Sequence, residues 1–581
     1  MIDEFLSKIN NIYNEIRGTL NKEEKIEIIN KCKSDLLIED SFSETYYNFI
    51  AKKKERGVVY TPLEISNYII NNTIKEEEII KNPFLKIVDP ACGCGNIIIP
   101  CFMYLKNIYV KNLDKINDLN NLTLKKDNIN NHIIKYNLFG YDVDLNAIKV
   151  LNIDLFYKTQ CFSNNFLCRD FLLDDITNKF DVFLSNPPYV GLKAIDKNYS
   201  IVLKSMYPSY KDKGDISYCF FEKSITCLKK NGKLGFITSR YFLESQSGEE
   251  LRGILAESCS IYKIVDFYGI RPFKNAGIDA VMIFLNNGKN SEQSTEVIKP
   301  KVMKNSKKEE FYSSLFYGHK EGIEKFYVNM KALDKGRWIL RNNEEISIIN
   351  KIEKNSVLTL NDVCISYQGI ITGCDKAFII DKETILREKI EEEIIRRWIK
   401  NKNVRENKVT ESDLYIIYSD FIDEVSKYPN AINYISKYKD KLEMRRECKK
   451  GIRKWYQLQW GRKSQVFEKK KIIFPYKASQ NRFAIDKKSY FSADVYCLVL
   501  KDNSKFTYEY LINILNSKTY EFYFKTFAKK LGENIYEYYP NTLMKLCIPD
   551  ILMNTNKFDE ETLYKKFDFT KKEIGIIHNL T

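Results

Sequence analysis

The stretch Leu85-Lys-Ile-Val-Asp-Pro-Ala-Cys-Gly-Cys-Gly-Asn-Ile-Ile-Ile99 decides the fold. Its first four residues predict a short strand, residues 89–96 form a glycine-rich turn, and the isoleucines that follow begin a helix. Strand, turn and helix in this order are the first unit of a nucleotide-type βαβ fold. Gly93 and Gly95 allow the backbone to approach a ligand closely. The turn lacks both the Gly-x-Gly-x-x-Gly spacing and a Gly-Lys-Ser/Thr, so neither a dinucleotide nor a triphosphate is the expected ligand.

Three further predicted strands follow, and each ends in polar or flat side chains. Their ends carry Asp142, the pair Asp170-Phe171, and Asn186-Pro187-Pro188-Tyr189. Parallel strands in an open α/β sheet end at one edge, where ligands bind. An acid after the second strand can accept both hydroxyls of a ribose, and we favour Asp142 over Asp144 for this role. An exposed loop acid is an equally good interpretation of Asp142 taken alone.

Asn186-Pro187-Pro188-Tyr189 is the motif with the clearest chemistry. It follows the apolar run 180–185, which predicts a buried strand that ends abruptly at two prolines. The side-chain oxygen of Asn186 and its backbone carbonyl are two acceptors held close together, and Tyr189 offers a flat face. This arrangement suits an exocyclic amino group on a planar ring. A rigid turn without chemistry is the alternative for these four residues alone.

Two other positions lie next to predicted strands or helices. Thr61-Pro62 is a helix-start signal, and a helix N-terminus favours an anion such as a carboxylate. Taken alone, an ordinary helix cap is the better interpretation. Phe273 is an apolar ring in the otherwise polar loop 271–277, directly before a predicted strand.

Composition limits the class of protein. The chain has 581 residues, so two or three domains are expected, and its formal net charge of +15 favours nucleic acid as a partner. No signal-peptide pattern and no run of about 18 apolar residues occurs, which predicts a cytoplasmic protein away from the membrane. The 14 Cys form no Cys-x-x-Cys pair and the three His lack plausible partners. We therefore expect neither a metal site nor His-based acid/base catalysis.

The chain divides into four predicted segments. Residues 1–50 have helical spacing and predict a helical lead-in, too short for a separate nuclease. Residues 51–300 would form the catalytic domain, and the highly charged segment 301–340 predicts a linker. Residues 341–581 would form a second, mixed α+β domain.

The second domain contains the strongest charge bias of the chain. Residues 441–482 hold fourteen Lys or Arg against three Glu, with aromatic residues between them. Basic groups neutralise phosphates, and aromatic rings contact bases or sugars, so we predict nucleic-acid contact rather than a merely solvated face. The candidate DNA-binding residues are Arg445, Arg446, Lys449, Arg453, Lys454, Trp455, Tyr456, Trp460, Arg462, Lys477 and Arg482.

The order of these motifs resembles that of a known family. Thr61-Pro62, the turn at Asp89, Asp142, Asp170-Phe171 and the Asn186 motif, followed by a basic half, are similar to the γ-class, TaqI-type DNA methyltransferases that act on adenine N6. Such enzymes have a catalytic domain followed by a target-recognition domain. Further segments are similar to clostridial orphan enzymes of this class: 367–378, 445–449, 451–456, 458–462 and 481–486.

The resemblance implies a Rossmann-like domain with S-adenosylmethionine (SAM) as cofactor. Thr61 would hold the methionine carboxylate, Asp89 the methionine amino group, Asp142 the ribose hydroxyls and Asp170 the adenine N6, with Phe171 beside that ring. The full set implied for the cofactor is Tyr60, Thr61, Asp89, Ala91, Gly93, Gly95, Asp142, Asp170, Phe171 and Asn186.

The resemblance also implies the reaction. Asn186 and Pro187 would bind the amino group of an adenine flipped out of duplex DNA, Tyr189 would stack on the base and Phe273 would cover its other side. A short, asymmetric, adenine-rich site, a monomer and a role in gene regulation, such as sporulation, are implied in the same way.

Four other functions remain open. The same motif serves methylation of RNA adenine and of glutamine in proteins, although the basic half favours nucleic acid. Cytosine-N4 methylation is less expected, because that group usually has Ser in place of Asn. A catalytically silent DNA-binding regulator is the remaining class, and turnover of SAM on DNA would exclude it.

Overall fold

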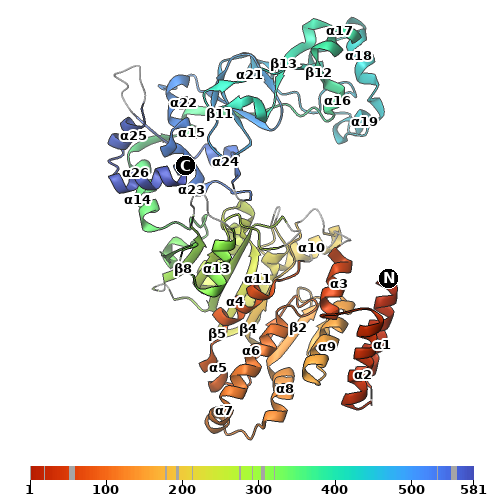
Figure 1. Cartoon of the computed structure of the whole chain (residues 1–581). Helices are drawn as coiled ribbons and strands as arrows, with labels where there is room; N and C mark the ends of the chain where they lie inside the picture. Colours follow the sequence, from red (N-terminus) through yellow and green to blue (C-terminus); the bar gives the residue numbers. More distant parts are fainter. Residues whose placement is uncertain are drawn as a thin grey trace. The chain divides into compact units, whose positions relative to one another are not determined.

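The structure is a computed structural model that describes residues 2–18, 20–51, 59–176, 179–191, 195–211, 214–273, 277–290, 292, 294–301, 308–319, 321–532, 534–550 and 559–581. The chain forms two compact units, 1–342 and 343–581. Each is described by itself below (Figure 1).

A nine-stranded sheet in the order β3-β2-β1-β4-β5-β7-β6-β8-β9 organises the first unit. Strands β1 to β5 are mutually parallel, and β7 runs antiparallel to both of its neighbours. The chain places β2 and β3 on one side of β1 and then returns to β4 on the other, which opens a crevice at the carboxyl ends of β1 and β4. The strands are β1 Ile87–Asp89, β2 Leu138–Asp142, β3 Phe166–Cys168, β4 Phe180–Ser185, β5 Leu228–Ser239, β6 Cys259–Asp266, β7 Ala280–Asn287, β8 Ser294–Pro300 and β9 Ile323–Asn329.

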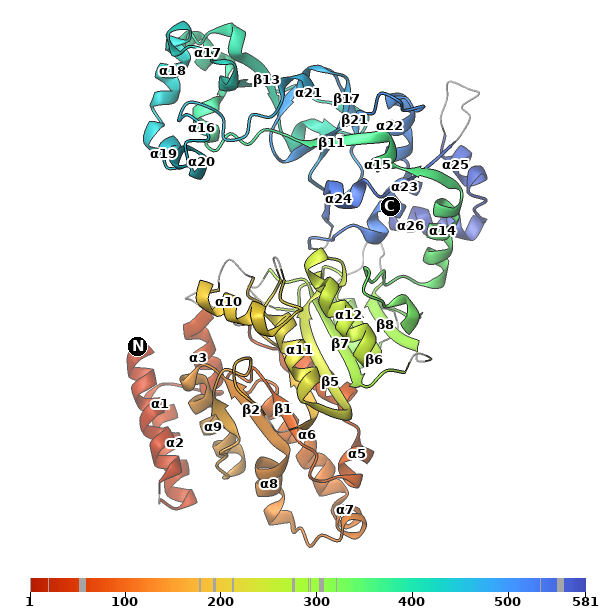
Figure 2. The ribbon, with the colours of Figure 1, turned by 180° about the vertical axis from the view of Figure 1, so that it is seen from behind.

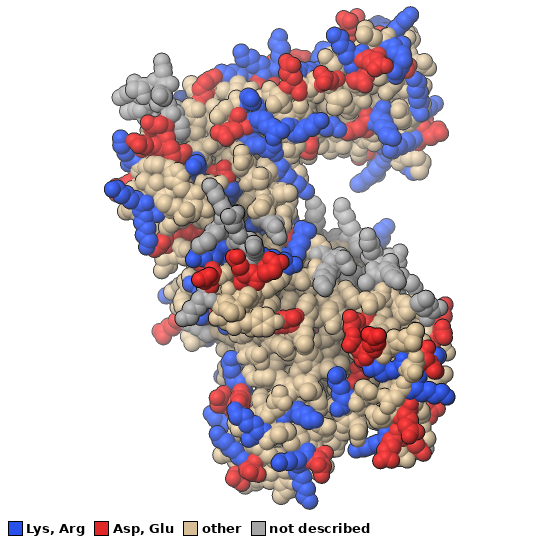
Figure 3. Space-filling view, in the orientation of Figure 1, with Lys and Arg blue, Asp and Glu red and all other residues tan. Residues whose placement is uncertain are grey.

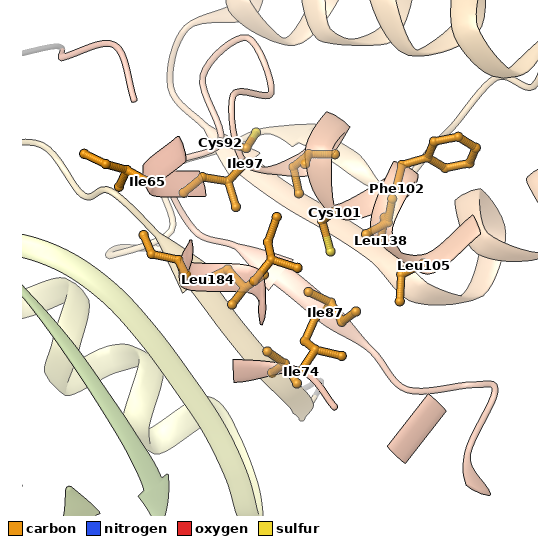
Figure 4. Close-up of a cluster of buried hydrophobic side chains, with 14 of the residues drawn as sticks. Ile65, Ile74, Ile87, Cys92, Ile97, Cys101, Phe102, Leu105, Leu138 and Leu184 are labelled. Carbon is orange, nitrogen blue, oxygen red and sulfur yellow. The ribbon is translucent and has the colours of Figure 1, made fainter. Parts of the chain in front are cut away.

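Helices cover both faces of this sheet, which is why its central strands are apolar throughout. In β4, Val182 and Leu184 pack into one hydrophobic core, and Phe183 points into the other. Figure 1 shows the first set of helices in front of the sheet, Figure 2 shows the second set from behind, and Figure 4 shows part of the first core. The first set comprises α4 Leu63–Thr73, α5 Glu76–Lys81, α6 Ile98–Lys111, α7 Leu113–Asn120, α8 Ile129–His132 and α13 Lys308–Tyr317; the second comprises α10 Lys197–Met206, α11 Ser217–Cys227 and α12 Glu249–Ser258.

The predicted α/β fold with its Rossmann-like first unit is confirmed. The turn at residues 89–96 joins β1 to α6 as expected, and the predicted strands that end at Asp142, before Asp170 and at Ser185 are all present. These elements were predictable because each is specified by a local pattern, an apolar run followed by a turn signal.

The N-terminal helices are part of the first unit and do not form a separate lead-in. Helices α1 Ile2–Arg17, α2 Lys22–Asp35 and α3 Phe42–Ala51 pack against α9 Leu145–Thr159. Phe5 and Ile9 of α1 share a hydrophobic cluster with Val150, Ile153 and Phe156 of α9. The apolar spacing in residues 1–50 thus reflects burial against a helix that follows far along the chain.

The predicted linker at 301–340 is also corrected. Residues 302–307 lie outside the described residues, but α13 and β9 belong to the first unit, and β9 completes its sheet by pairing with β8. Lys325 and Glu324 of β9 make ion pairs with Glu296 and Lys299 of β8. The predicted linker thus contains a helix and an edge strand of the first unit.

The second unit contains two four-stranded sheets and two hydrophobic cores, in agreement with the predicted mixed α+β domain. One sheet has the order β11-β21-β17-β19 and the other β12-β16-β13-β20. Their strands are β11 Cys364–Gln368, β12 Ile379–Asp381, β13 Ile395–Ile399, β16 Leu414–Ile417, β17 Lys471–Pro475, β19 Ala484–Asp486, β20 Tyr490–Phe491 and β21 Val495–Leu500. The helices of this unit include α14 Asn343–Lys354, α16 Asp375–Phe378, α17 Lys382–Glu388, α18 Pro429–Ser436, α19 Lys439–Glu443, α20 Arg446–Lys449, α21 Ser464–Glu468, α22 Tyr508–Asn516, α23 Lys518–Phe527, α24 Pro540–Leu543, α25 Glu560–Lys566 and α26 Lys571–Leu580.

Asp154 fixes the N-terminal helices in place, and its replacement provides a test. Its buried carboxylate on α9 accepts hydrogen bonds from the backbone N–H groups of Phe42 (3.1 Å) and Ser43 (2.9 Å), which open α3. We expect Asp154→Ala to lower the stability of the first unit by about 1–3 kcal/mol, measured by thermal unfolding and by proteolysis of α1 to α3. Asp35→Ala is the control, because Asp35 makes only an exposed pair with Lys8. Equal effects of the two changes would contradict the assignment.

Candidate active site

A cavity of about 450 Å³ lies at the carboxyl ends of β1 to β4. Its wall is built from α3 with the loop before α4, the glycine turn after β1, the loops after β2, β3 and β4, and residues of α9, α10 and α11. Of the residues predicted to bind a cofactor or to act in catalysis, those that line it are Tyr60, Thr61, Asp89, Ala91, Gly93, Asp142, Asp170, Phe171, Asn186, Pro187 and Tyr189.

Asp89 is the last residue of β1 and is fully buried at the floor of this cavity. One carboxylate oxygen accepts hydrogen bonds from the hydroxyl of Ser185 (2.7 Å) and the backbone N–H of Ala91 (3.0 Å). Burial nevertheless raises the pKa of Asp89 to about 7, since removal from water disfavours the charged form more than these donors stabilise it. The carboxyl group therefore changes charge close to neutral pH.

Asp142 is held by the glycine turn. Its two carboxylate oxygens accept hydrogen bonds from the backbone N–H groups of Gly93 and Asp144, both at 2.8 Å. Burial raises the pKa of Asp142 above its ordinary value. Asp144 instead caps α9 through Asn146 (2.9 Å) and accepts from the hydroxyl of Tyr46 (2.8 Å). Both carboxylates thus have protein partners and both line the cavity, so these contacts do not distinguish the two residues, and Asp142 stays the predicted ribose ligand.

The two glycines of the turn have different surroundings. Gly93 has a positive φ of 50°, and a side chain built there would meet no atom within 4 Å, so this position faces open space. Gly95, predicted to line the cofactor, lies outside the cavity wall and close to Leu151 of α9, where an added Cβ would come within 2.3 Å. Gly95 is needed because the turn packs closely against α9. A glycine needed only for such packing gives the same sequence pattern as one that contacts a ligand.

Asp170 follows β3 with both of its oxygens engaged. One accepts from the backbone N–H of Leu172 (2.9 Å), and the other accepts from the hydroxyl of Tyr199 on α10 (2.8 Å). Phe171 is 2% exposed and stacks on Phe220 at 5.9 Å between ring centroids. The two rings close the end of the cavity beside Asp170, which suits a planar heterocycle.

The carboxamide of Asn186 is oriented by the segment before α4. Its nitrogen donates to the hydroxyl oxygen of Thr61 (2.9 Å) and weakly to the carbonyl of Val59 (3.4 Å). A carbonyl only accepts, so this contact fixes which end of the carboxamide is the nitrogen. The side-chain oxygen of Asn186 consequently faces away from this segment, toward Tyr189, where it accepts a hydrogen bond from the Tyr189 hydroxyl.

Tyr189 and Phe273 lie next to each other. Their ring centroids are 5.9 Å apart with an angle of 46° between the planes, and Phe273 is 4% exposed. Phe273 thus reaches the Asn186 motif from the loop after β6, as expected, although it does not itself line the cavity. Residues 274–276 of that loop lie outside the described residues.

Four further aromatic or polar side chains of the cavity were not expected from the sequence. Ser43, Tyr46 and Tyr47 come from α3, and Tyr199 comes from α10. No local pattern distinguishes them, because they reach the cavity only through the packing of their helices. The one signal available was the pair of adjacent tyrosines in an amphipathic helix.

The predicted DNA-binding residues divide by exposure. Arg446, Lys449, Lys454, Trp460, Arg462 and Lys477 are exposed, whereas Arg453, Trp455 and Arg482 are half-buried. Arg445 and Tyr456 lie in the interior. The guanidinium of Arg445 donates to four backbone carbonyls, those of Thr372, Leu442, Trp455 and Gln457, at 2.8–3.1 Å. These two residues are therefore removed from the candidate DNA contacts.

Two family models match the chain. Residues 103–273 match the Eco57I restriction-modification methylase, and residues 388–548 match the TaqI-like C-terminal specificity domain. The Type II methyltransferase M.BstVI of Geobacillus stearothermophilus is 25% identical over 533 residues, covering 87% of this chain and 92% of the relative. M.BanIII of Aneurinibacillus aneurinilyticus is 25% identical over 468 residues, covering 74% and 78% respectively.

Solved structures agree in fold. The type IIL restriction-modification enzyme MmeI in complex with DNA aligns with a TM-score of 0.57 and 14% identity, over 87% of this chain and 73% of that one. A nuclease-deletion mutant of the type ISP enzyme LlaGI aligns with a TM-score of 0.53 and 13% identity, over 90% and 46%.

The chain thus joins a methylase domain to a TaqI-like specificity domain, the architecture of DNA methyltransferases of the restriction–modification type. Its cofactor is S-adenosylmethionine. The cavity fits this cofactor: buried carboxylates follow β1 and β2 for an ammonium group and two hydroxyls, and Asp170 with two flat rings suits an adenine.

Among the described residues, no helix has the length and apolar character needed to span a membrane. The same part of the chain contains no group of three or more His, Cys, Asp or Glu side chains arranged to hold a metal ion.

We expect the raised pKa of Asp89 to make SAM binding depend on pH, because this carboxylate is the predicted ligand of the methionine amino group. An ammonium group binds the carboxylate but not the neutral acid, so affinity should rise as the pH passes upward through about 7. We expect SAM to bind about tenfold more tightly at about pH 7.0 than at about pH 5.5, a range in which its amino group stays mostly protonated. Calorimetric titration would measure this change. The slope should disappear in Asp89→Asn, and an unchanged slope there would contradict the assignment.

Proposed function

We propose that this protein transfers a methyl group from SAM to N6 of an adenine flipped out of duplex DNA. The order of its motifs, with the cofactor residues before Asn186 and the specificity domain last, supports the γ-class. The proposal includes action as a monomer, without a metal, on DNA in the cytoplasm.

The observation that carries this proposal is the orientation of the Asn186 carboxamide. Thr61 and Val59 engage its nitrogen, so its oxygen is presented at the carboxyl end of β4, beside an aromatic ring. A fixed acceptor beside a flat face selects a planar ring with an exocyclic amino group. Adenine N6 meets this description, and the specificity domain supports DNA as the molecule that carries the base.

The chain's own residues then act mainly by positioning. The adenine amino nitrogen is a poor nucleophile because its lone pair is delocalised into the ring. Acceptors at the Asn186 side chain and in the backbone of the Asn186-Pro187 segment draw both N–H groups to one side, which directs the lone pair toward the cofactor. When bound, SAM supplies an electrophilic methyl group. The N–C bond forms as the C–S bond breaks, and the amino proton leaves to solvent.

Entry of a base requires a rearrangement of Tyr189. A base stacked between two rings needs about 3.5 Å on each side, and the centroids of Tyr189 and Phe273 are only 5.9 Å apart. The hydroxyl of Tyr189 also occupies the oxygen of Asn186 that the amino group would use. The target base therefore replaces the tyrosine hydroxyl on Asn186 as the rings separate.

Charge on the second unit supports a phosphate-rich partner. Figure 3 shows Lys and Arg side chains on the visible face of this unit, and the exposed members of the predicted set include Arg446, Lys449, Lys454 and Lys477. None of these four has a carboxylate partner among the ion pairs between described residues. They are available to neutralise phosphates.

Transfer of labelled methyl to duplex DNA tests the function. We expect label in N6-methyladenine, and a loss of at least about a hundredfold in Asn186→Ala, since one fixed hydrogen-bonding group is removed from the reacting nitrogen. The control is Asn198→Ala, an exposed asparagine on α10. SAM binding without any label in DNA would exclude the proposal and direct the assay to RNA and to protein glutamine. Label in N4-methylcytosine would still identify a DNA methyltransferase but would show that the target base is cytosine and not adenine.

The two functions of Tyr189 can be separated by substitution. Tyr189→Phe loses the hydroxyl that closes the site but keeps the ring, so we expect activity within about threefold of wild type. Tyr189→Ala loses the stacking surface, worth roughly 1–3 kcal/mol, and should lower kcat/KM by about tenfold or more. Steady-state kinetics on one duplex would show the difference. Equal losses in both variants would mean that the hydroxyl itself is needed.

A further inference from the structure

A short ribbon in the second unit has features that the proposed function leaves unexplained. Segments 368–372 and 458–462 run antiparallel, and Ile371 and Trp460 exchange two backbone hydrogen bonds of 3.1 and 2.9 Å. We call these ten residues the paired ribbon. Its second segment, 458–462, lies within the region that matches the TaqI-like specificity domain, and its first segment, 368–372, lies before that region.

Side chains outside the paired ribbon hold its backbone in place. The hydroxyl of Tyr418 contacts the carbonyls of Gly461 (3.1 Å) and Arg462 (2.9 Å), and Arg445 donates to the carbonyl of Thr372 (3.1 Å). Asp420 lies so close to Gly461 that an added Cβ would come within 2.2 Å of its carboxylate. These contacts hold the backbone rigidly and leave the opposite side of the ribbon free of them.

Polar and aromatic side chains of the ribbon reach the surface. Arg462 is exposed, and Trp460 is 37% exposed. Arg462 donates through Nε to the carbonyl of Gly369 (3.2 Å) and through Nη2 to the side-chain oxygen of Gln368 (2.8 Å). Its φ is +68°, a conformation that non-glycine residues rarely adopt. The two hydrogen bonds of the Arg462 side chain fix its guanidinium plane before any ligand binds.

The chemistry of this pair selects its ligand. The side-chain oxygen of Gln368 accepts from Arg462, so the groups left to bind a ligand are N–H donors. One is Nη1 of Arg462, for which the described residues provide no hydrogen-bond partner. The other is the side-chain amide nitrogen of Gln368, whose contact with the Ala493 carbonyl is long at 3.4 Å. Two N–H donors fixed side by side in this way match a ligand that presents two neighbouring acceptors. In the major groove, guanine offers N7 and O6 in this arrangement, and two-stranded ribbons fit that groove.

We propose that the paired ribbon reads base edges in the target duplex and that Arg462, braced by Gln368, recognises a guanine. This inference rests on the proposed function and adds to it the residues that determine sequence preference. Trp460, exposed beside the pair, contacts the neighbouring nucleotide. Lys449 and Lys454 would contact phosphates and contribute affinity without sequence preference.

The first experiment maps sequence preference. Wild type, Arg462→Ala, Gln368→Ala and Lys449→Ala are given SAM and a pool of random duplexes, and methylated sites are sequenced. We expect a G:C pair at one position of the wild-type site, with that preference lost in Arg462→Ala and weakened in Gln368→Ala. Lys449→Ala should lower methylation of all sites alike. A wild-type site without any G:C preference, or one unchanged in Arg462→Ala, overturns the proposal.

The second experiment changes the DNA, so its wild-type measurement does not depend on the folding of a variant. The guanine of the preferred site is replaced by 7-deazaguanine, which pairs normally but lacks the N7 acceptor. We expect about a tenfold lower kcat/KM for wild type, and no further loss when the same duplex is given to Arg462→Ala, whose side chain cannot reach N7. An equal penalty in wild type and in Arg462→Ala would overturn the role of Arg462. No methylation of any duplex by wild type would instead contradict the proposed function itself.

Discussion

Parallel alignment of β1 to β5 is the constraint on which the rest of the first unit depends. Strands that run in one direction end at one edge, so groups from distant parts of the chain meet there without any contact between their segments elsewhere. Asp89, Asp142, Asp170 and Asn186 each follow a different strand and line one cavity. The burial that makes such a sheet stable also removes Asp89 from water and brings its pKa close to 7. Stability and the electrostatics of the site have the same cause.

How much of this could be predicted depends on how local each signal is. The strand before Asn186 is an apolar run that ends at two prolines, and the turn after β1 is defined by its glycines; both follow from neighbouring residues. Tyr46 and Tyr199 reach the cavity only because whole helices pack on the sheet, and nothing within their own segments shows it. The charged segment before residue 340 was misjudged because β9 is specified by its pairing with β8, which the composition of the segment does not show.

The basic segment 441–482 of the second unit also shows what the sequence alone could not predict. Counting charges identified the region but could not separate Arg445, which holds four backbone carbonyls in the interior, from Arg462, which is exposed on the paired ribbon. The two residues are chemically identical and lie in the same basic segment of the sequence. An arginine that fixes the backbone and one that contacts a partner are both expected in a recognition domain. Only the three-dimensional partners of each guanidinium distinguish them.

The packing of α1 to α3 on α9 has a consequence for how the protein is made. The apolar face of α1, with Phe5 and Ile9, leaves the ribosome long before α9 is synthesised. Until then these side chains have no helix to cover them, and the nascent N-terminus exposes a hydrophobic surface of the kind that chaperones bind. Contacts between residues so far apart also slow folding. Cofactor binding, which uses a wall from α3, therefore has to wait until α9 has been made and α3 has packed against it.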